Sequence, residues 1–226
     1  MFYRPLFSTM FGTLFLSGAL NASEMIEIAP LGVAGYTENF SKGFDVNIQM
    51  KMARSGQVAK AKMTIQQLPG KPEKRLGGDW IGVNLTGSIF INKEKFDVRY
   101  LDLYDQRTFR LQHSIDLSEQ SISSYQWTNV PESMWVGQKI KVGTVVEKDS
   151  SGKTLSSGDV DFVLSRVGDG FEFCTLKIVK NTESKEQEIT KDCDLFDSSK
   201  RIVGTTIEVK LGSQWITSGA GKIRVK

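Results

Sequence analysis

The chain has 226 residues, of which 39% are hydrophobic and 24% are charged, and its formal net charge is +3. Because 29 lysines and arginines are interleaved with 26 acidic residues, the pattern favours solvated faces and excludes a concentrated basic surface for nucleic acid. This length is sufficient for one large β domain or for two small ones.

The first 22 residues form a predicted signal peptide. They contain one early cation, Arg4, an apolar run from Phe11 to Leu20, and a small residue at Ala22. The run is short for a membrane span, so we predict cleavage after Ala22 and a mature chain without a transmembrane helix. We therefore expect a periplasmic or secreted protein. An amphitropic anchor that is not cleaved is the alternative.

The clearest strand pattern follows in residues 43–52, where apolar and polar residues alternate strictly. The alternation resumes at Ala59, and we predict a hairpin in which Met50 lies opposite Ala61 and Ile48 opposite Met63. Its apolar ladder is interpreted either as core or as the lining of a cavity for an apolar molecule. The predicted lining residues are Phe44, Val46, Ile48, Met50, Met63 and Ile65.

Further strand patterns recur about every ten residues, with turn signals between them. Strands predicted over residues 96–104 and 108–117 pair Tyr100 with Leu111. We predict an all-β fold: an antiparallel hairpin meander that forms a barrel-like sheet or a two-sheet sandwich. After the signal peptide, residues 23–130 form an N-terminal half and residues 131–226 a C-terminal half, as two domains or one continuous domain.

Both cysteines lie in the C-terminal half. Pairing Cys174 opposite Cys193 also sets Ile178 opposite Ile189, so one hairpin register satisfies both pairs. We predict a disulfide there, which agrees with export, since disulfides persist in oxidising compartments. For the preceding hairpin, we predict a three-residue loop over residues 169–171, which would place Phe162 on the same face as Cys174.

A segment within residues 131–180 resembles a β-sheet module of exported bacterial proteins of unassigned function. It reads P-E-S-M-W-V-G-Q-K-I, then V-D-F-V-L-S-R-V and F-E-F-C-T-L-K-I-V. In such modules a Pro and a V-G-x step precede a hairpin, and a phenylalanine precedes a Lys-Ile or Lys-Val pair. The resemblance implies an exported β fold and transfers no catalytic residue.

Candidate chemistry is sparse. His113 is the only histidine and lies in an alternating strand, so we interpret it as a half-buried side chain with a satisfied hydrogen bond. No motif of a serine hydrolase, zinc protease or nucleotide-binding loop occurs. We expect no catalytic residue, no metal site and no cofactor. The carboxylate pairs predicted to be solvated are Asp159 with Asp161 and Asp192 with Asp194.

The tyrosines and tryptophans offer a second possible binding surface. Tyr100, Tyr125, Trp127 and Trp135 could stack on a ligand, although packing in the core is the more frequent role of such residues. We predict a non-enzymatic envelope protein that binds an apolar small molecule or lipid within its sheet. An interaction or assembly module that binds an envelope protein is the alternative, and an outer-membrane β-barrel is the third.

Overall fold

The computed structural model describes residues 24–28, 44–51, 58–67, 73–91, 94–108, 110–211 and 214–225. In these ranges the regular elements are β-strands, joined by antiparallel pairings. The strands are β1 (Met25–Glu27), β2 (Phe44–Lys51), β3 (Val58–Gln67), β4 (Glu73–Arg75), β5 (Gly78–Ile91), β6 (Glu94–Asp105), β7 (Leu111–Asp116), β8 (Ser121–Trp127), β9 (Ser133–Trp135), β10 (Lys139–Lys148), β11 (Thr154–Val167), β12 (Gly170–Asn181), β13 (Gln187–Phe196), β14 (Ile202–Leu211) and β15 (Gln214–Val225). The predicted all-β class is confirmed.

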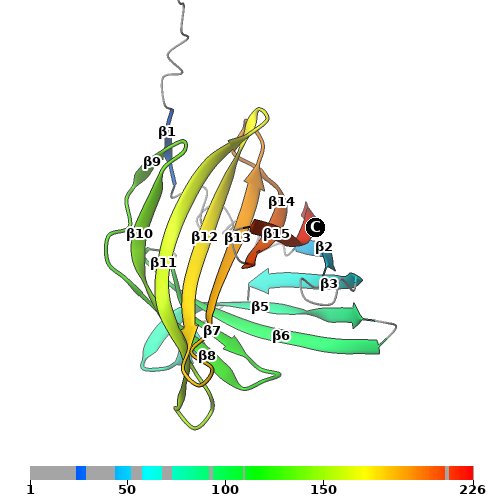
Figure 1. The fold of residues 1–226 in the computed structure, drawn as a ribbon, viewed down its shortest axis with the longest axis vertical. Coiled ribbons are helices and arrows are strands. Elements are labelled where there is room, and N and C mark those ends of the chain that lie inside the picture. Colours follow the sequence, from blue (N-terminus) through cyan, green and yellow to red (C-terminus); the bar gives the residue numbers. More distant parts are fainter. Residues whose placement is uncertain are drawn as a thin grey trace, which may run out of the picture.

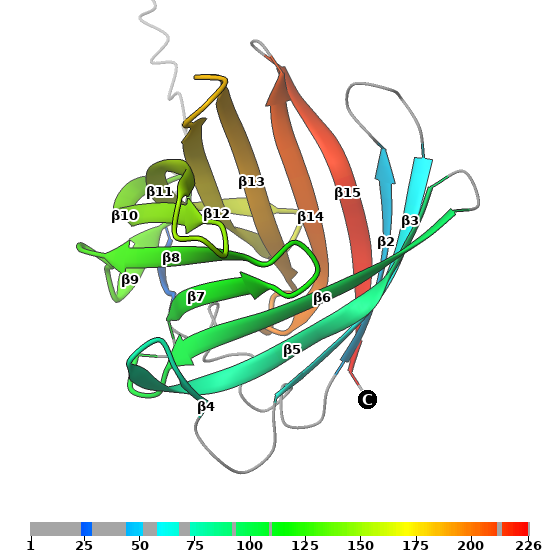
Figure 2. The same cartoon turned by 90° about the horizontal axis from the view of Figure 1, so that it is seen from below.

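One large sheet contains 13 of these strands, in the order β3-β2-β15-β14-β13-β12-β11-β10-β8-β7-β6-β5-β4. Strand β3 pairs with β5 as well as with β2, so the two ends of the order come together. Figures 1 and 2 show the barrel-like curvature: β5 and β6 run across one side, and the long strands from β11 to β15 form the opposite side. No helix in the described ranges is long and apolar enough to cross a membrane.

The sheet continues across residue 130, because β8 pairs with β10. The small second sheet joins the two predicted halves as well, since β1 pairs with β9. Ile26 from β1 and Met134 from β9 are buried against Leu164, Phe173 and further apolar side chains of the large sheet. The residue range predicted for a signal peptide lies outside the described residues.

The predicted hairpin of β2 and β3 forms, but its register differs by two residues. Met50 pairs with Ala59 and Ile48 with Ala61, in place of the predicted partners Ala61 and Met63. A shift of two residues leaves every position on its predicted face, because the strand period is two. The apolar–polar alternation therefore predicted which residues of the two strands share a face. It did not select one register, because registers that differ by two residues satisfy it equally well.

The disulfide hairpin is confirmed. Cys174 lies opposite Cys193 and Ile178 opposite Ile189 across β12 and β13. The cysteines form a disulfide with their Cα atoms 4.0 Å apart, a short separation typical of a non-hydrogen-bonded pair. This bond is typical of exported proteins.

The prediction for the turn between β11 and β12 is wrong. Val167 pairs with Gly170, so the loop has two residues, and Phe162 lies opposite Thr175 on the face away from Cys174. Gly168 has a φ of 57°, which suits the first central position of a tight hairpin turn. Both faces of these strands carry apolar side chains, so hydrophobicity did not select the register and turn chemistry did.

The predicted register of β6 and β7 is also wrong. Tyr104, and not Tyr100, pairs with Leu111. The carboxylate of Asp105 accepts hydrogen bonds from the backbone N–H groups of Arg107 and Thr108, and the backbone N–H of Asp105 donates to Arg110. This turn is longer than the predicted one, and it shifts β7 along its neighbour.

Candidate functional site

The two faces of the large sheet are distinguished by charged side chains on distant strands that influence each other. Asp102 on β6 interacts electrostatically with Lys177 on β12, although four strands lie between them in the sheet. Side chains so far apart along a sheet approach each other only across its concave side. We call the side that carries Asp102 and Lys177 the concave face and the opposite side the convex face.

Asp102 occupies a polar position among aromatic and apolar neighbours. Its carboxylate accepts a hydrogen bond of 2.6 Å from the Ser114 hydroxyl and a long one of 3.5 Å from the Tyr104 hydroxyl. Burial raises its pKa to about 6, against the lowering effect of Ser114, Lys177 and Tyr104. Among the described residues it forms no ion pair, so the carboxylate is held by hydroxyl groups.

Lys177 supplies the positive charge of this face. Its ammonium lies 3.3 Å from the Asp192 carboxylate and 5.8 Å from the centre of the Tyr125 ring. Electrostatic interaction with Tyr125, followed by that with Asp192, raises the pKa of Lys177 against the opposing effect of burial. The side chains of Lys177 and Asp192 remain 30% and 43% exposed, so water reaches this pair.

Aromatic side chains continue the concave face on one side of Lys177. The rings of Tyr125 and Trp127 stack at 5.6 Å, Trp127 contacts Phe162 at 5.6 Å, and Phe162 contacts Phe173 at 4.9 Å. The Trp127 indole donates to the Leu111 carbonyl, which fixes its orientation. Tyr125 and Phe173 are 8% and 7% exposed and belong to the apolar core, and Trp127 and Phe162 pack against it as half-buried side chains.

Tyr104 links the polar and aromatic parts. Its side chain is buried, and burial, followed by the charges of Asp102 and Asp194, raises its pKa well above the usual value. The phenol is therefore neutral at physiological pH and can donate a hydrogen bond. We call Asp102, Tyr104, Ser114, Lys177 and Asp192 the concave cluster.

The convex face carries its own charged groups. Lys139 pairs with Asp161 and Lys141 with Asp159, both at 2.9 Å. The side chains of Lys141 and Asp159 are 61% and 46% exposed, which confirms a solvated carboxylate at that position. Asp161 is instead buried to 6% exposure by its neighbours.

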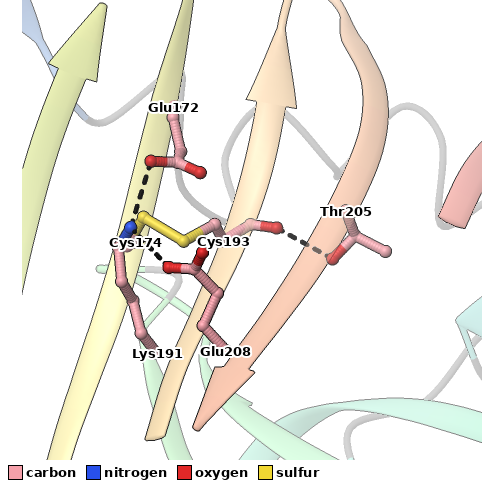
Figure 3. The surroundings of a disulfide bond; sticks show 6 residues. All are labelled: Glu172, Cys174, Lys191, Cys193, Thr205 and Glu208. Atoms are coloured by element: carbon pink, nitrogen blue, oxygen red, sulfur yellow. Dashed lines mark hydrogen bonds and ion pairs between the residues drawn. A yellow bond between two sulfur atoms is a disulfide. The ribbon is translucent and has the colours of Figure 1, made fainter. Parts of the chain in front are cut away.

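Three strands meet at an ion triad beside the disulfide, which Figure 3 shows. The ammonium of Lys191 on β13 lies 3.2 Å from Glu172 on β12 and 2.9 Å from Glu208 on β14. Glu172 also approaches both cysteine sulfurs, within a spacing that could hold a metal ion. Because the sulfurs are bonded to each other, thiolate ligands are missing and this group is not a metal site.

The predicted ligand-lining positions lie on paired strands, but their side chains are outside the described part of the structure. They are Phe44, Val46, Ile48, Met50, Met63 and Ile65. Their role as a lining stays a prediction.

The four aromatic residues predicted as a set do not all meet. Tyr125 and Trp127 stack together, whereas Trp135 is 43% exposed on β9. Tyr100 lines a shallow groove of about 560 Å³ beside Asn84 and Arg99 on β5 and β6. Tyr100 alternates with Asp102 on β6 and so shares the concave face, but among the described residues only Tyr125 and Trp127 of this set stack on each other.

His113 has the surroundings predicted for it. Its Nδ1 atom lies 3.0 Å from the Ser124 hydroxyl, and the Trp80 ring meets it edge-on at 5.3 Å. Burial lowers the pKa of His113, which keeps the imidazole neutral at physiological pH.

The concave cluster itself was missed in the sequence. A signal was present, because Asp102 falls on the same alternating positions as Phe96, Val98, Tyr100 and Tyr104. Lys177 similarly alternates with Phe173 in β12. A charged residue at an inward-alternating position of each strand was the available clue, but the strand pattern alone did not show that the two would meet.

Comparison with known proteins gives little. No protein-family model matches the chain, and no curated protein matches it. Among solved structures, a porin-like protein from Bacteroides uniformis is similar with 10% sequence identity and a TM-score of 0.30, over 83% of this chain and 98% of that one. At this level the likeness carries no argument about function.

Proposed function

We propose that this chain is an exported, non-enzymatic protein of the cell envelope that binds an amphipathic small molecule on its concave face. The observation that carries the proposal is the concave cluster: charged and hydroxyl groups, reached by water, beside a stacked aromatic row. The aromatic row and the predicted apolar ladder would hold the apolar body. The concave cluster would hold the polar end.

The disulfide supports the exported location, since such bonds persist in the periplasm or outside the cell. The predicted signal peptide points to the same location. The charged convex face, with the pairs Lys139–Asp161 and Lys141–Asp159, disfavours the outer-membrane β-barrel, because such a barrel turns an apolar band outward.

Binding of anilinonaphthalene sulfonate, an apolar fluorescent probe with one charged end, tests the proposal. We expect the folded protein to bind the probe and Lys177→Met to bind it several-fold more weakly, because the cation on the concave face is lost. Lys141→Met removes an exposed cation of the convex face and is the matched control. Thermal melting checks that both variants fold.

The proposal fails if the folded protein does not bind the probe. It also fails if the two lysine variants bind the probe equally, because the concave cluster would then have no part in binding.

The second candidate is an interaction or assembly module of the envelope. It is favoured by an open strand edge on β6, where residues 94–98 pair with β5 and with no other strand in the described ranges. An open edge presents backbone groups to an additional strand.

A further inference from the structure

The open edge of β6 is defined by the extents of its neighbours. Strand β5 pairs with β6 from Glu94 onward, whereas β7 pairs with it only from Tyr100. One further backbone bond connects Leu117 N–H to the Arg99 carbonyl. Among the described strands, residues 94–98 thus have a neighbour on one side only, and we call them the β6 edge.

The backbone groups of the β6 edge are directed outward at alternate residues. Since the Arg99 carbonyl is directed toward β7, the alternation of an antiparallel ladder directs the backbone groups of Asp97 and Lys95 to the same side. Only the Ser118 hydroxyl, 3.4 Å from the Asp97 carbonyl, contacts them among the described residues. The edge can therefore accept another strand.

Exposed apolar side chains flank this edge on both faces of the sheet, since Phe96 pairs with Ile89 whereas Phe90 pairs with Lys95. Phe96 is 49% exposed, Phe90 on β5 is 43% exposed, and Leu117 after β7 is 45% exposed. The groove of about 560 Å³ runs beside the same edge and is lined by Lys95, Asp97 and Leu117 among other residues. Large exposed side chains beside unpaired backbone groups are typical of an interaction surface.

We propose that the β6 edge pairs, antiparallel, with the β6 edge of a second copy of this chain. The two-fold axis passes at Phe96, so that the two Phe96 rings lie opposite each other. In this register Lys95 lies opposite Asp97 of the second copy, and the same ion pair forms twice. This self-association does not depend on the proposed ligand binding.

Charge selects both the partner and the register. Lys95 and Asp97 are exposed and lie 2.8 Å apart within one strand, so their alternation is complementary to itself when the strand is reversed. A register centred on Asp97 would instead place two carboxylates opposite each other and Lys95 opposite Arg99. Five paired residues bury little area, so the dimer is weak and forms as the protein concentration rises.

Sedimentation of the mature protein over a range of concentrations tests the proposal, with three variants designed from the ion pair. Lys95→Asp and Asp97→Lys each place like charges opposite each other twice, and each weakens dimerisation about tenfold. The double variant exchanges the two signs and restores the dimer. An equimolar mixture of the two single variants forms a heterodimer for the same reason.

Lys180→Asp, which changes an exposed cation on β12, is the matched control and leaves dimerisation unchanged. Hydrogen exchange adds a direct readout, because the amides of Lys95 and Asp97 become protected at high concentration. A protein that stays monomeric overturns the proposal. A dimer whose dissociation constant is the same in the parent and in the charge variants also overturns it. A monomer that binds a strand of a different protein at this edge also overturns it.

Discussion

Two charged clusters on opposite faces of the large sheet differ in how their carboxylates are paired. On the convex face Lys191 lies between two glutamates beside the disulfide, and the three side chains are 15% to 23% exposed. On the concave face Lys177 and Asp192 are more exposed, and Asp102 forms no ion pair among the described residues. In the convex cluster one cation is shared by two carboxylates, and the contact ties three strands together. The concave cluster has polar capacity left for another molecule.

Among changes on the convex face, removing the disulfide should lower the stability of the protein most. The bond closes a loop with a sequence separation of 19, and its loss by Cys174→Ala with Cys193→Ala should lower the free energy of unfolding by about 3 kcal/mol. Denaturant titration measures this loss. Probe binding on the concave face should persist in conditions where the variant is folded. A variant as stable as the parent would show that the strand ladder alone holds this region.

Asp102→Asn, on the concave face, should raise the free energy of unfolding, whereas loss of the disulfide lowers it. The folded state raises the Asp102 pKa from 3.8 to about 6, so it binds more protons than the unfolded state in that window. Stability from this group is therefore present below pH 3.8 and is lost as the pH rises to about 6. The variant should gain up to about 3 kcal/mol at pH 7 and flatten this part of the pH profile.

The control for Asp102→Asn is Asp159→Asn, which removes a carboxylate that is 46% exposed on the convex face. Stability measured by denaturant titration between pH 4 and pH 7 distinguishes the two variants. If Asp102→Asn were destabilising at pH 7, the carboxylate would be stabilised by its neighbours more than burial penalises it.

Lys191→Met tests whether the convex cluster is structural. Its side chain is 17% exposed, and its removal leaves Glu172 and Glu208 close to each other without their shared cation. We expect a loss of about 1 kcal/mol in unfolding free energy and no change in probe binding. Reduced probe binding in a folded Lys191→Met protein would remove the distinction between the two faces.

His113→Gln should change the free energy of unfolding least of these variants, and its effect should depend on pH. Burial lowers the His113 pKa, so the folded state binds fewer protons than the unfolded state below pH 6.5. Stability from this group is present above pH 6.5 and is lost as the pH falls through the lowered pKa. The variant should lose only this increase of stability with rising pH. A larger loss would indicate a structural role of the Ser124 contact.

The sequence was informative where two independent constraints agreed. The cysteines and isoleucines of β12 and β13 selected one register, and the structure has it. Apolar alternation alone failed at the β11–β12 turn, because both faces carry apolar residues and the position of Gly168 decided the loop. Apolar alternation also did not distinguish the predicted β2–β3 register from the observed one, which differs by two residues.

The concave cluster could not be predicted from strand patterns. Asp102 and Lys177 are 75 positions apart in the chain, and four strands separate them in the sheet. Their approach depends on how strongly the whole sheet curves, and curvature accumulates over many strands with no single residue that encodes it. The alternation placed each residue on a face of its own strand without showing that the two residues would approach each other across the concave side.

Native mass spectrometry of the mature protein, isolated from its own cells under gentle conditions, tests the central claim most directly. We predict a fraction with the added mass of one small molecule, which Lys141→Met retains and Lys177→Met loses. The bare mass of the polypeptide in the parent protein, with the fold intact, would contradict a ligand on the concave face.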